Sequence, residues 1–483
     1  MPGVKSYLQE DWAIVVLGFL IILLSLAGVH VALPDYKWST TGDLTTKVLT
    51  GANFLKIGAQ FIYVLLVALL GSFLTGRSLK NTLLVFPAVF ILTTLALIVA
   101  GNAALNELGL EAVIFSLIIG LLIGNLFKLP TWFREALTSE FFVKIGLVLL
   151  GTTVIFSDVL KAGSLGLIQA LVVVISVWYF SYWVCKQLKI DKELTMMLSS
   201  AVSICGVSAA IATSGAIKGD SKKLSLVISL VLITAIPMMI FMPMIAHHFQ
   251  FPEEVTGAWL GGSIDTTGAV VASGSLVGET ALKISTIVKF SQNVLLGIAA
   301  FAISVYWTYT KHPNAADKEQ KPTLKVIWDR FPKFVIGFII ASLVFSFLLS
   351  PAAIAPVKGS LKSLQGLWFA LAFTSIGLET NFKDLIGTES RKPVYAFLIA
   401  QTFNVIVTLI FGLPAVFLAR LITFFSILPV YEIPESLCFP GEDEWRARIS
   451  GGCCRSIPSP EKNDGRAGII GRKGITRRCA MVQ

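Results

Sequence analysis

The sequence predicts an all-α polytopic membrane protein, and three features of its composition lead to that fold class. Apolar residues make up 55% of the 483 positions, charged residues only 14%, and the mean hydropathy is +0.78. A soluble domain averages about 25% charged residues. The apolar residues also form blocks close to the length of about 20 residues that a helix needs to span a bilayer. This composition argues against a soluble enzyme and against a disordered chain.

About eleven of these blocks are predicted to be transmembrane helices, because each is long and predominantly apolar. In chain order they are Trp12–Val31, Phe54–Leu74, Leu83–Ala100, Leu110–Phe127, Phe141–Ile155, Leu165–Val184, Leu224–Ile245, Ala281–Trp307, Phe334–Leu349, Leu364–Leu378 and Pro393–Phe417. With the N-terminus on the cytoplasmic side, the basic loops fall inside, as the positive-inside rule requires. These loops carry Arg77 and Lys80, Lys128 and Arg134, Lys186 to Lys192, Lys311 to Arg330, and Arg391 and Lys392.

Two further segments, Leu194–Ile217 and Val255–Val277, are rich in Gly, Ser, Thr and Ala instead of Leu. If Leu194–Ile217 crossed the bilayer once, the basic cluster that starts at Lys218 would lie outside and the acidic pair at Glu253 inside. If it dips in and returns, both charge clusters obey the positive-inside rule. We therefore expect two broken, re-entrant hairpins that enter from opposite faces. Non-helical backbone at membrane depth is tolerated where it lines a cavity or is buried in protein.

Internal similarity supports an inverted-repeat transporter architecture. The pattern Gly151-x4-Phe156-x-Asp158 recurs as Gly377-x4-Phe382-x-Asp384, on spans expected to run in opposite directions. The hairpins also match in register, with a Ser-Ile pair at 203–204 and at 263–264. Inverted repeats whose broken segments meet near the midplane are typical of secondary transporters. The alternative is a chance likeness between short segments rich in small residues.

The chain is expected to form a transmembrane transporter domain over residues 1–430 and a polar tail over residues 431–483. The tail holds four of the six cysteines, at a spacing that fits no zinc pattern, so we expect it to be disordered or non-native and not a metal site. The net charge of +10 is assigned to cytoplasmic loops that face anionic lipid, and no nucleic acid partner is expected.

The first hairpin offers four candidate binding residues: Ser203, Cys205, Gly206 and Ser208. Small residues allow a ligand to approach the backbone closely, and free amides at a helix start bind anions. The alternative is close helix packing through small residues.

The second hairpin contributes Ser263, Asp265, Thr266 and Thr267. An ionisable residue inside an apolar segment is a functional candidate because its unpaired burial is costly. Asp265 therefore suggests proton or cation coupling, or alternatively a cap on the following half-helix.

The next span adds Lys289 and Asn293. Lys289 lies deep in that span, where it would serve as a countercharge for an anion or as the partner of Asp265. No nucleotide-binding loop and no metal-ligand motif is present, so neither a cofactor nor a metal is expected.

Several motifs resemble a known family. They include Ile204-Cys205-Gly206-x-Ser208-Ala209, the hairpin from Ser263 to Gly274, Lys289, and Ile376-Gly377-Leu378-Glu379-Thr380. Over roughly residues 80 to 417 the chain resembles the bacterial sulfate exporter family, multi-pass proteins of the inner membrane to which sulfate export is attributed. Many members carry Ile-His-Asp in the second hairpin and Arg three residues after the lysine. This chain has Asp265 after Ile264, and Gln292 in place of the arginine.

The residues and the resemblance together lead us to expect a secondary active transporter of a small anion such as sulfate, working by alternating access. H⁺ or Na⁺ is the expected coupling ion, the lipid bilayer is the surrounding partner, and a homo-oligomer is left open. A second hypothesis is a cation/proton exchanger that uses Asp265. A third is an intramembrane enzyme with Cys205 as nucleophile, which is disfavoured because no histidine lies near it in the predicted buried segments.

Overall fold

The computed structural model describes residues 7–29, 31–107, 112–311, 325–380 and 391–427. The chain divides into two compact units, Met1–Phe424 and Phe425–Gln483, and the first unit holds the site. The predicted polar tail, residues 431–483, lies outside the described residues, and so does the end of the second Gly-x4-Phe-x-Asp pattern.

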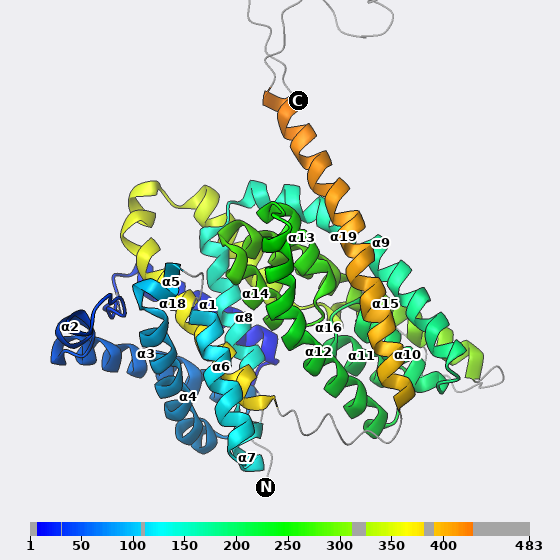
Figure 1. Ribbon diagram of the computed structural model, residues 1–483, viewed down its shortest axis with the longest axis horizontal. Helices are drawn as coiled ribbons and strands as arrows, with labels where there is room; N and C mark the ends of the chain where they lie inside the picture. Colours follow the sequence, from blue (N-terminus) through cyan, green and yellow to red (C-terminus); the bar gives the residue numbers. More distant parts are fainter. Residues whose placement is uncertain (1–6, 30, 108–111, 312–324, 381–390, 428–483) are drawn as a thin grey trace, which may run out of the picture. The chain divides into compact units, whose positions relative to one another are not determined.

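The described part of the chain is helical, with one isolated β-bridge between Trp38 and Asn102, so the predicted all-α class is confirmed (Figure 1). The first elements are α1 Glu10–Leu26, α2 Thr41–Asp43, η1 Leu44–Val48, α3 Gly51–Thr75, α4 Leu79–Ala100, α5 Ala103–Glu107, α6 Ala112–Leu126, α7 Thr131–Ala136, α8 Ser139–Leu150 and η2 Gly151–Thr153. Next come α9 Phe156–Gln187, α10 Lys192–Ser203, α11 Val207–Ile217, α12 Ser221–His248, α13 Glu253–Ser263, α14 Thr267–Val277 and α15 Glu279–Lys311. The last are α16 Lys325–Arg330, α17 Lys333–Leu343, η4 Val344–Leu348, α18 Pro351–Glu379 and α19 Arg391–Ile427.

Among the described residues, seven helical stretches are long and apolar enough to cross a membrane. They are Gly51–Thr75, Leu79–Ala100, Thr131–Thr153, Phe156–Gln187, Ser221–His248, Glu279–Trp307 and Arg391–Gly412. The other four predicted spans correspond to α1, α6, α17 with η4, and α18. The chain is therefore a polytopic membrane protein.

Helix α18 is longer than its apolar pattern indicates. The hydropathy predicts a span from Leu364, whereas the helix begins at Pro351. Ser350 caps it by accepting a hydrogen bond from the amide of Ala353, and proline fits the first helical position because its backbone needs no donor there. Capping residues, and not hydropathy, mark this helix end.

Each of the two Gly- and Ser-rich segments is a hairpin of two helices whose outer ends lie together. In the first hairpin (α10 and α11), Asp191 and Glu193 at the start bind the ammonium of Lys223, which follows the end of α11, at 2.8 and 3.1 Å. In the second hairpin (α13 and α14), Glu253 at the start accepts from the amide of Thr280 just past its end, at 3.2 Å. Both segments thus return to the side from which they entered. Figure 1 shows α13 towards the upper edge of the bundle and α10 towards the lower edge.

Close backbone contact holds the second hairpin against α15. A β-carbon built on Gly261 would lie 2.4 Å from the carbonyl oxygen of Ser285, so only glycine fits there. Such contacts are a general device of membrane proteins, where helix association depends on tight packing more than on the hydrophobic effect. Helix α15 is thereby positioned beside the second hairpin.

Candidate functional site

The tips of the two hairpins meet deep inside the protein. In each, the helix stops and a short non-helical stretch follows, Ile204–Gly206 in the first hairpin and Ile264–Thr266 in the second. A β-carbon built on Gly206 would lie 3.1 Å from the β-carbon of Asp265, which shows how closely the tips approach. Gly206 has φ +60° and ψ −110°, a conformation that a residue with a side chain adopts only with strain.

Lys289 of α15 joins the two tips. Its side-chain nitrogen donates to the carbonyl oxygens of Ile204 and Ile264, both at 2.8 Å, and to Oε1 of Gln292 at 3.0 Å. An ammonium group has three donors, so all of them are engaged. Lys289 is 1% exposed. Lys289, which the sequence suggested as a countercharge for an anion or as the partner of Asp265, therefore donates to the protein's own backbone carbonyls and to Gln292 in this conformation.

Three amide side chains satisfy further backbone carbonyls near the breaks. Gln292 donates to the carbonyl of Gly262 at 2.8 Å, which fixes its oxygen towards Lys289. Gln401 and Asn404 of α19 both donate to the carbonyl of Ser263, at 2.9 and 3.1 Å. Asn404 also reaches the carbonyl of Val202 in the first hairpin at 3.2 Å. Because no water hydrogen-bonds to backbone inside a bilayer, these amides satisfy carbonyl groups that the helix breaks leave free.

The sequence reasoning did not single out Gln401 or Asn404. Both are nearly fully buried amides in an otherwise apolar span. A polar amide within such a span was the available signal, since buried polar groups need partners.

A cavity of about 580 Å³ lies against the tips. Cys205, Ser208, Thr266, Thr267 and Asn293 contribute to its wall. The first residues of α11 and α14 also border it, so two helix N-termini, which carry partial positive charge, are directed at this space. Thr266 caps α14 through the amide of Ala269, whereas the N-cap residue of α11 is Gly206, which has no side chain that could act as a cap.

The other five candidate residues do not form part of the cavity wall. Ser203 donates to the carbonyl of Ser199 at 2.7 Å, within its own helix. Gly206 belongs to the first tip, Ser263 ends α13 just before the second tip, and Lys289 binds both tips. Asp265 is 2% exposed, and its Oδ2 has no hydrogen-bond partner among the described residues.

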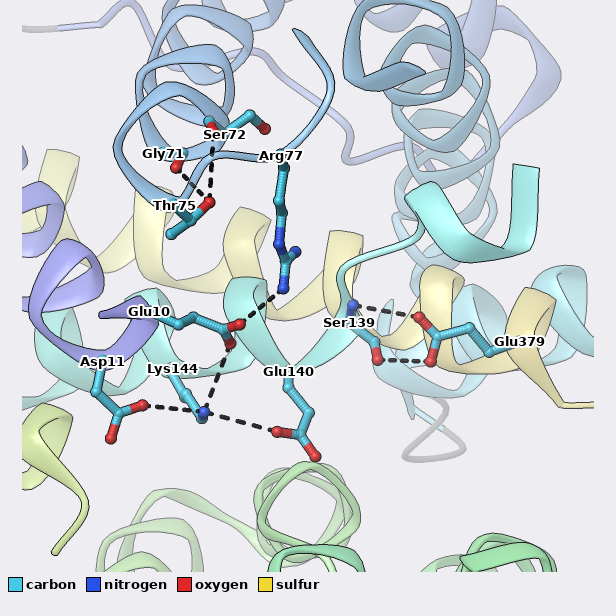
Figure 2. Close-up of polar contacts among 10 residues, drawn as sticks. All are labelled: Glu10, Asp11, Gly71, Ser72, Thr75, Arg77, Ser139, Glu140, Lys144 and Glu379. Carbon is cyan, nitrogen blue, oxygen red and sulfur yellow. Dashed lines mark hydrogen bonds and ion pairs between the residues drawn. The ribbon is translucent and has the colours of Figure 1, made fainter. Parts of the chain in front are cut away.

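Charged side chains also line the cavity, and several of them take part in a network of ion pairs (Figure 2). The ammonium of Lys144 lies 3.1 Å from Asp11, 3.6 Å from Glu140 and 3.7 Å from Glu10. Glu10 also binds Arg77 at 2.7 Å. We call this group (Glu10, Asp11, Arg77, Glu140 and Lys144) the charge cluster. Each basic side chain of this group is paired with at least one acidic side chain.

Carboxylates from other helices cap two helices beside the charge cluster. Glu379 at the end of α18 accepts from the amide and the hydroxyl of Ser139 at the start of α8, at 3.3 and 2.7 Å. Asp11 accepts from the amide of Lys333 at the start of α17, at 3.0 Å. A carboxylate at a helix N-terminus is favourable because it satisfies free amides and complements the helix dipole. The N-termini of α8 and α17 are thus occupied by the protein's own anions, whereas that of α11 is not.

The sequence matches a family model described as conserved hypothetical protein 698 over residues 84–396. A UPF0324 membrane protein of Rhodopirellula baltica is 40% identical over 76% of this chain and 70% of its own length. One from Nitratidesulfovibrio vulgaris is 37% identical over 69% of this chain, which spans 59% of that relative. One from Nitrosomonas europaea is 29% identical over 63% of this chain and 68% of its own length. No solved structure matches the chain.

Proposed function

The chain belongs to the conserved hypothetical protein 698 family, and we propose that it is a secondary active transporter of a small anion. One observation carries the proposal: two re-entrant hairpins from opposite sides bring their tips together beside a cavity. This arrangement is typical of carriers that bind substrate near the midplane and expose it alternately to either side. We place the protein in the bacterial inner membrane.

Helix polarity favours an anion as the substrate. The N-termini of α11 and α14 border the cavity, and the N-cap residue of α11 is a glycine. Each helix N-terminus contributes typically about 0.3–1 kcal/mol to binding an anion, and up to about 2 kcal/mol when partly buried. Hydroxyl and amide groups from Ser208, Thr267 and Asn293 supply further hydrogen bonds.

Lys289 takes an indirect part in this proposal. Because its three donors bind Ile204, Ile264 and Gln292, the lysine holds the tips in place and the anion contacts the helix N-termini. Our proposed substrate class is sulfate or another sulfur oxyanion. In this proposal the cavity opens to the cytoplasm at the charge cluster.

The test is uptake of labelled sulfate and sulfite into liposomes that contain the purified protein. Replacing Ser208 with alanine removes one hydrogen bond to a charged ligand, which is worth about 1.5–3 kcal/mol, or roughly a ten- to hundredfold loss of affinity. Ser275→Ala is the control, because that hydroxyl donates to the carbonyl of Val271 within α14 of the other hairpin and does not line the cavity. Equal transport by both variants, or no protein-dependent flux of any tested anion, would refute the proposal.

A second candidate is a cation/proton exchanger that uses Asp265. The observation in its favour is the buried Oδ2 of Asp265, which has no partner among the described residues and would accept a proton. Na⁺ or K⁺ added outside protein-containing liposomes would then enter in exchange for H⁺ and make the lumen more alkaline, and Asp265→Asn would abolish the change.

A further inference from the structure

The oxygens around the Lys289 ammonium form a group that is suited to a small cation. Two of them, the carbonyl oxygens of Ile204 and Ile264, stand at the C-terminal ends of α10 and α13. Helix C-termini carry partial negative charge and leave carbonyl groups without intrahelical partners. The third, Oε1 of Gln292, is held in place by the bond from its amide to Gly262.

In secondary transporters, the carbonyl groups of broken segments and the C-terminal ends of half-helices commonly coordinate the coupling Na⁺. Here the same kind of oxygens surrounds a positive charge that is part of the chain. We propose that the Lys289 ammonium replaces a coupling cation at the crossing of the hairpins, so that the protein needs no Na⁺ there. Removal of this ammonium would create a binding site for a small monovalent cation.

This inference rests on the proposed function only where it concerns the coupling of transport. The physical claim itself, that the oxygens accept either an ammonium or a metal cation, is a property of the folded chain. It can therefore be tested without substrate, by thermal unfolding of the purified full-length protein.

Two variants separate a cation site from a simple space-filling role. Lys289→Ala removes the charge and leaves room beside the oxygens. Lys289→Met also removes the charge but fills the space with an unbranched apolar chain. Both lose three hydrogen bonds and are expected to be less stable than the unmodified chain in choline chloride.

The unfolding midpoint is measured in NaCl, LiCl, KCl and choline chloride at one ionic strength. We expect the midpoint of Lys289→Ala to rise saturably by a few degrees with Na⁺ or Li⁺, because a ligand that binds only the folded state stabilises it. The midpoints of Lys289→Met and of the unmodified chain should be the same in all four salts.

Two outcomes would overturn the inference. One is a folded Lys289→Ala protein whose midpoint is the same in all four salts. The other is a saturable Na⁺ response of the unmodified chain, and this measurement decides the matter even if neither variant folds. Failure of anion transport, in contrast, would refute the proposed function and leave these midpoints unaffected.

Discussion

Gly206 provides a sharp test of the tip geometry, because replacing it with alanine disturbs the backbone and the packing together. The residue has φ +60° and ψ −110°, which an alanine adopts only at a cost of about 1–3 kcal/mol. Its new β-carbon would lie 2.6 Å from a methyl group of Val231, and such overpacking costs typically about 1–3 kcal/mol. We therefore expect Gly206→Ala to lower the free energy of unfolding by roughly 2–6 kcal/mol.

Thermal unfolding in detergent measures this effect, and anion binding measures its consequence for the site. Val231→Ala in the same chain removes the methyl contact but not the backbone strain, so the double variant should recover part of the lost stability. Gly366→Ala on α18 is the control, because its new β-carbon meets no atom within 4 Å. If Gly206→Ala unfolds at the same temperature as the control and binds anions as tightly as the unmodified chain, then Gly206 does not have the strained backbone conformation and the close contact with Val231 on which this prediction rests.

Two further predictions concern the side chains that support the site. Replacing both Gln401 and Asn404 with leucine removes the two side-chain donors to the carbonyl of Ser263, so the free energy of unfolding should fall by about 1–3 kcal/mol. Thr402→Val, on the exposed face of α19, is the control and should have little effect in the same unfolding assay. Equal midpoints for the two proteins would contradict this account of the amides. Lys144→Met leaves Asp11 and Glu140 without their counter-ion, and we expect it to lower the free energy of unfolding by about 1–3 kcal/mol. Lys47→Met, which breaks an exposed pair with Asp43, should leave the midpoint unchanged, and a similar loss in both lysine variants would count against a specific role of the charge cluster.

The sequence was sufficient to predict the two hairpins because two independent signals agreed. Small and hydroxyl-bearing residues marked Leu194–Ile217 and Val255–Val277 as unusual, and the charges at Lys218 and Glu253 favoured re-entry. The matched Ser-Ile pairs in the two segments also correspond in the structure, where Ile204 and Ile264 present equivalent carbonyl groups to one lysine.

What the sequence could not provide was the set of partners of each buried polar group. Lys289 binds carbonyl groups 85 and 25 positions away along the chain, and backbone carbonyls carry no residue-type signal. Gln401 and Asn404 were missed because their role depends on where α19 packs. The capping of α8 by Glu379 likewise depends on a contact between residues 240 positions apart.

The two helix breaks separate the negative helix ends, which face Lys289, from the positive helix ends, which border the cavity. Each hairpin breaks over only three residues, so it places the C-terminal end of one helix and the N-terminal start of another close together. The C-terminal ends of α10 and α13 are directed at Lys289, and the N-terminal starts of α11 and α14 border the cavity. The negative ends are thus neutralised by a charge built into the chain, whereas the positive ends remain available to a ligand. A substrate in the cavity would therefore meet the positive ends of α11 and α14 and not the negative ends of α10 and α13, and this favours an anion. The position of Lys289 and the proposed selectivity for anions thus follow from the same geometry.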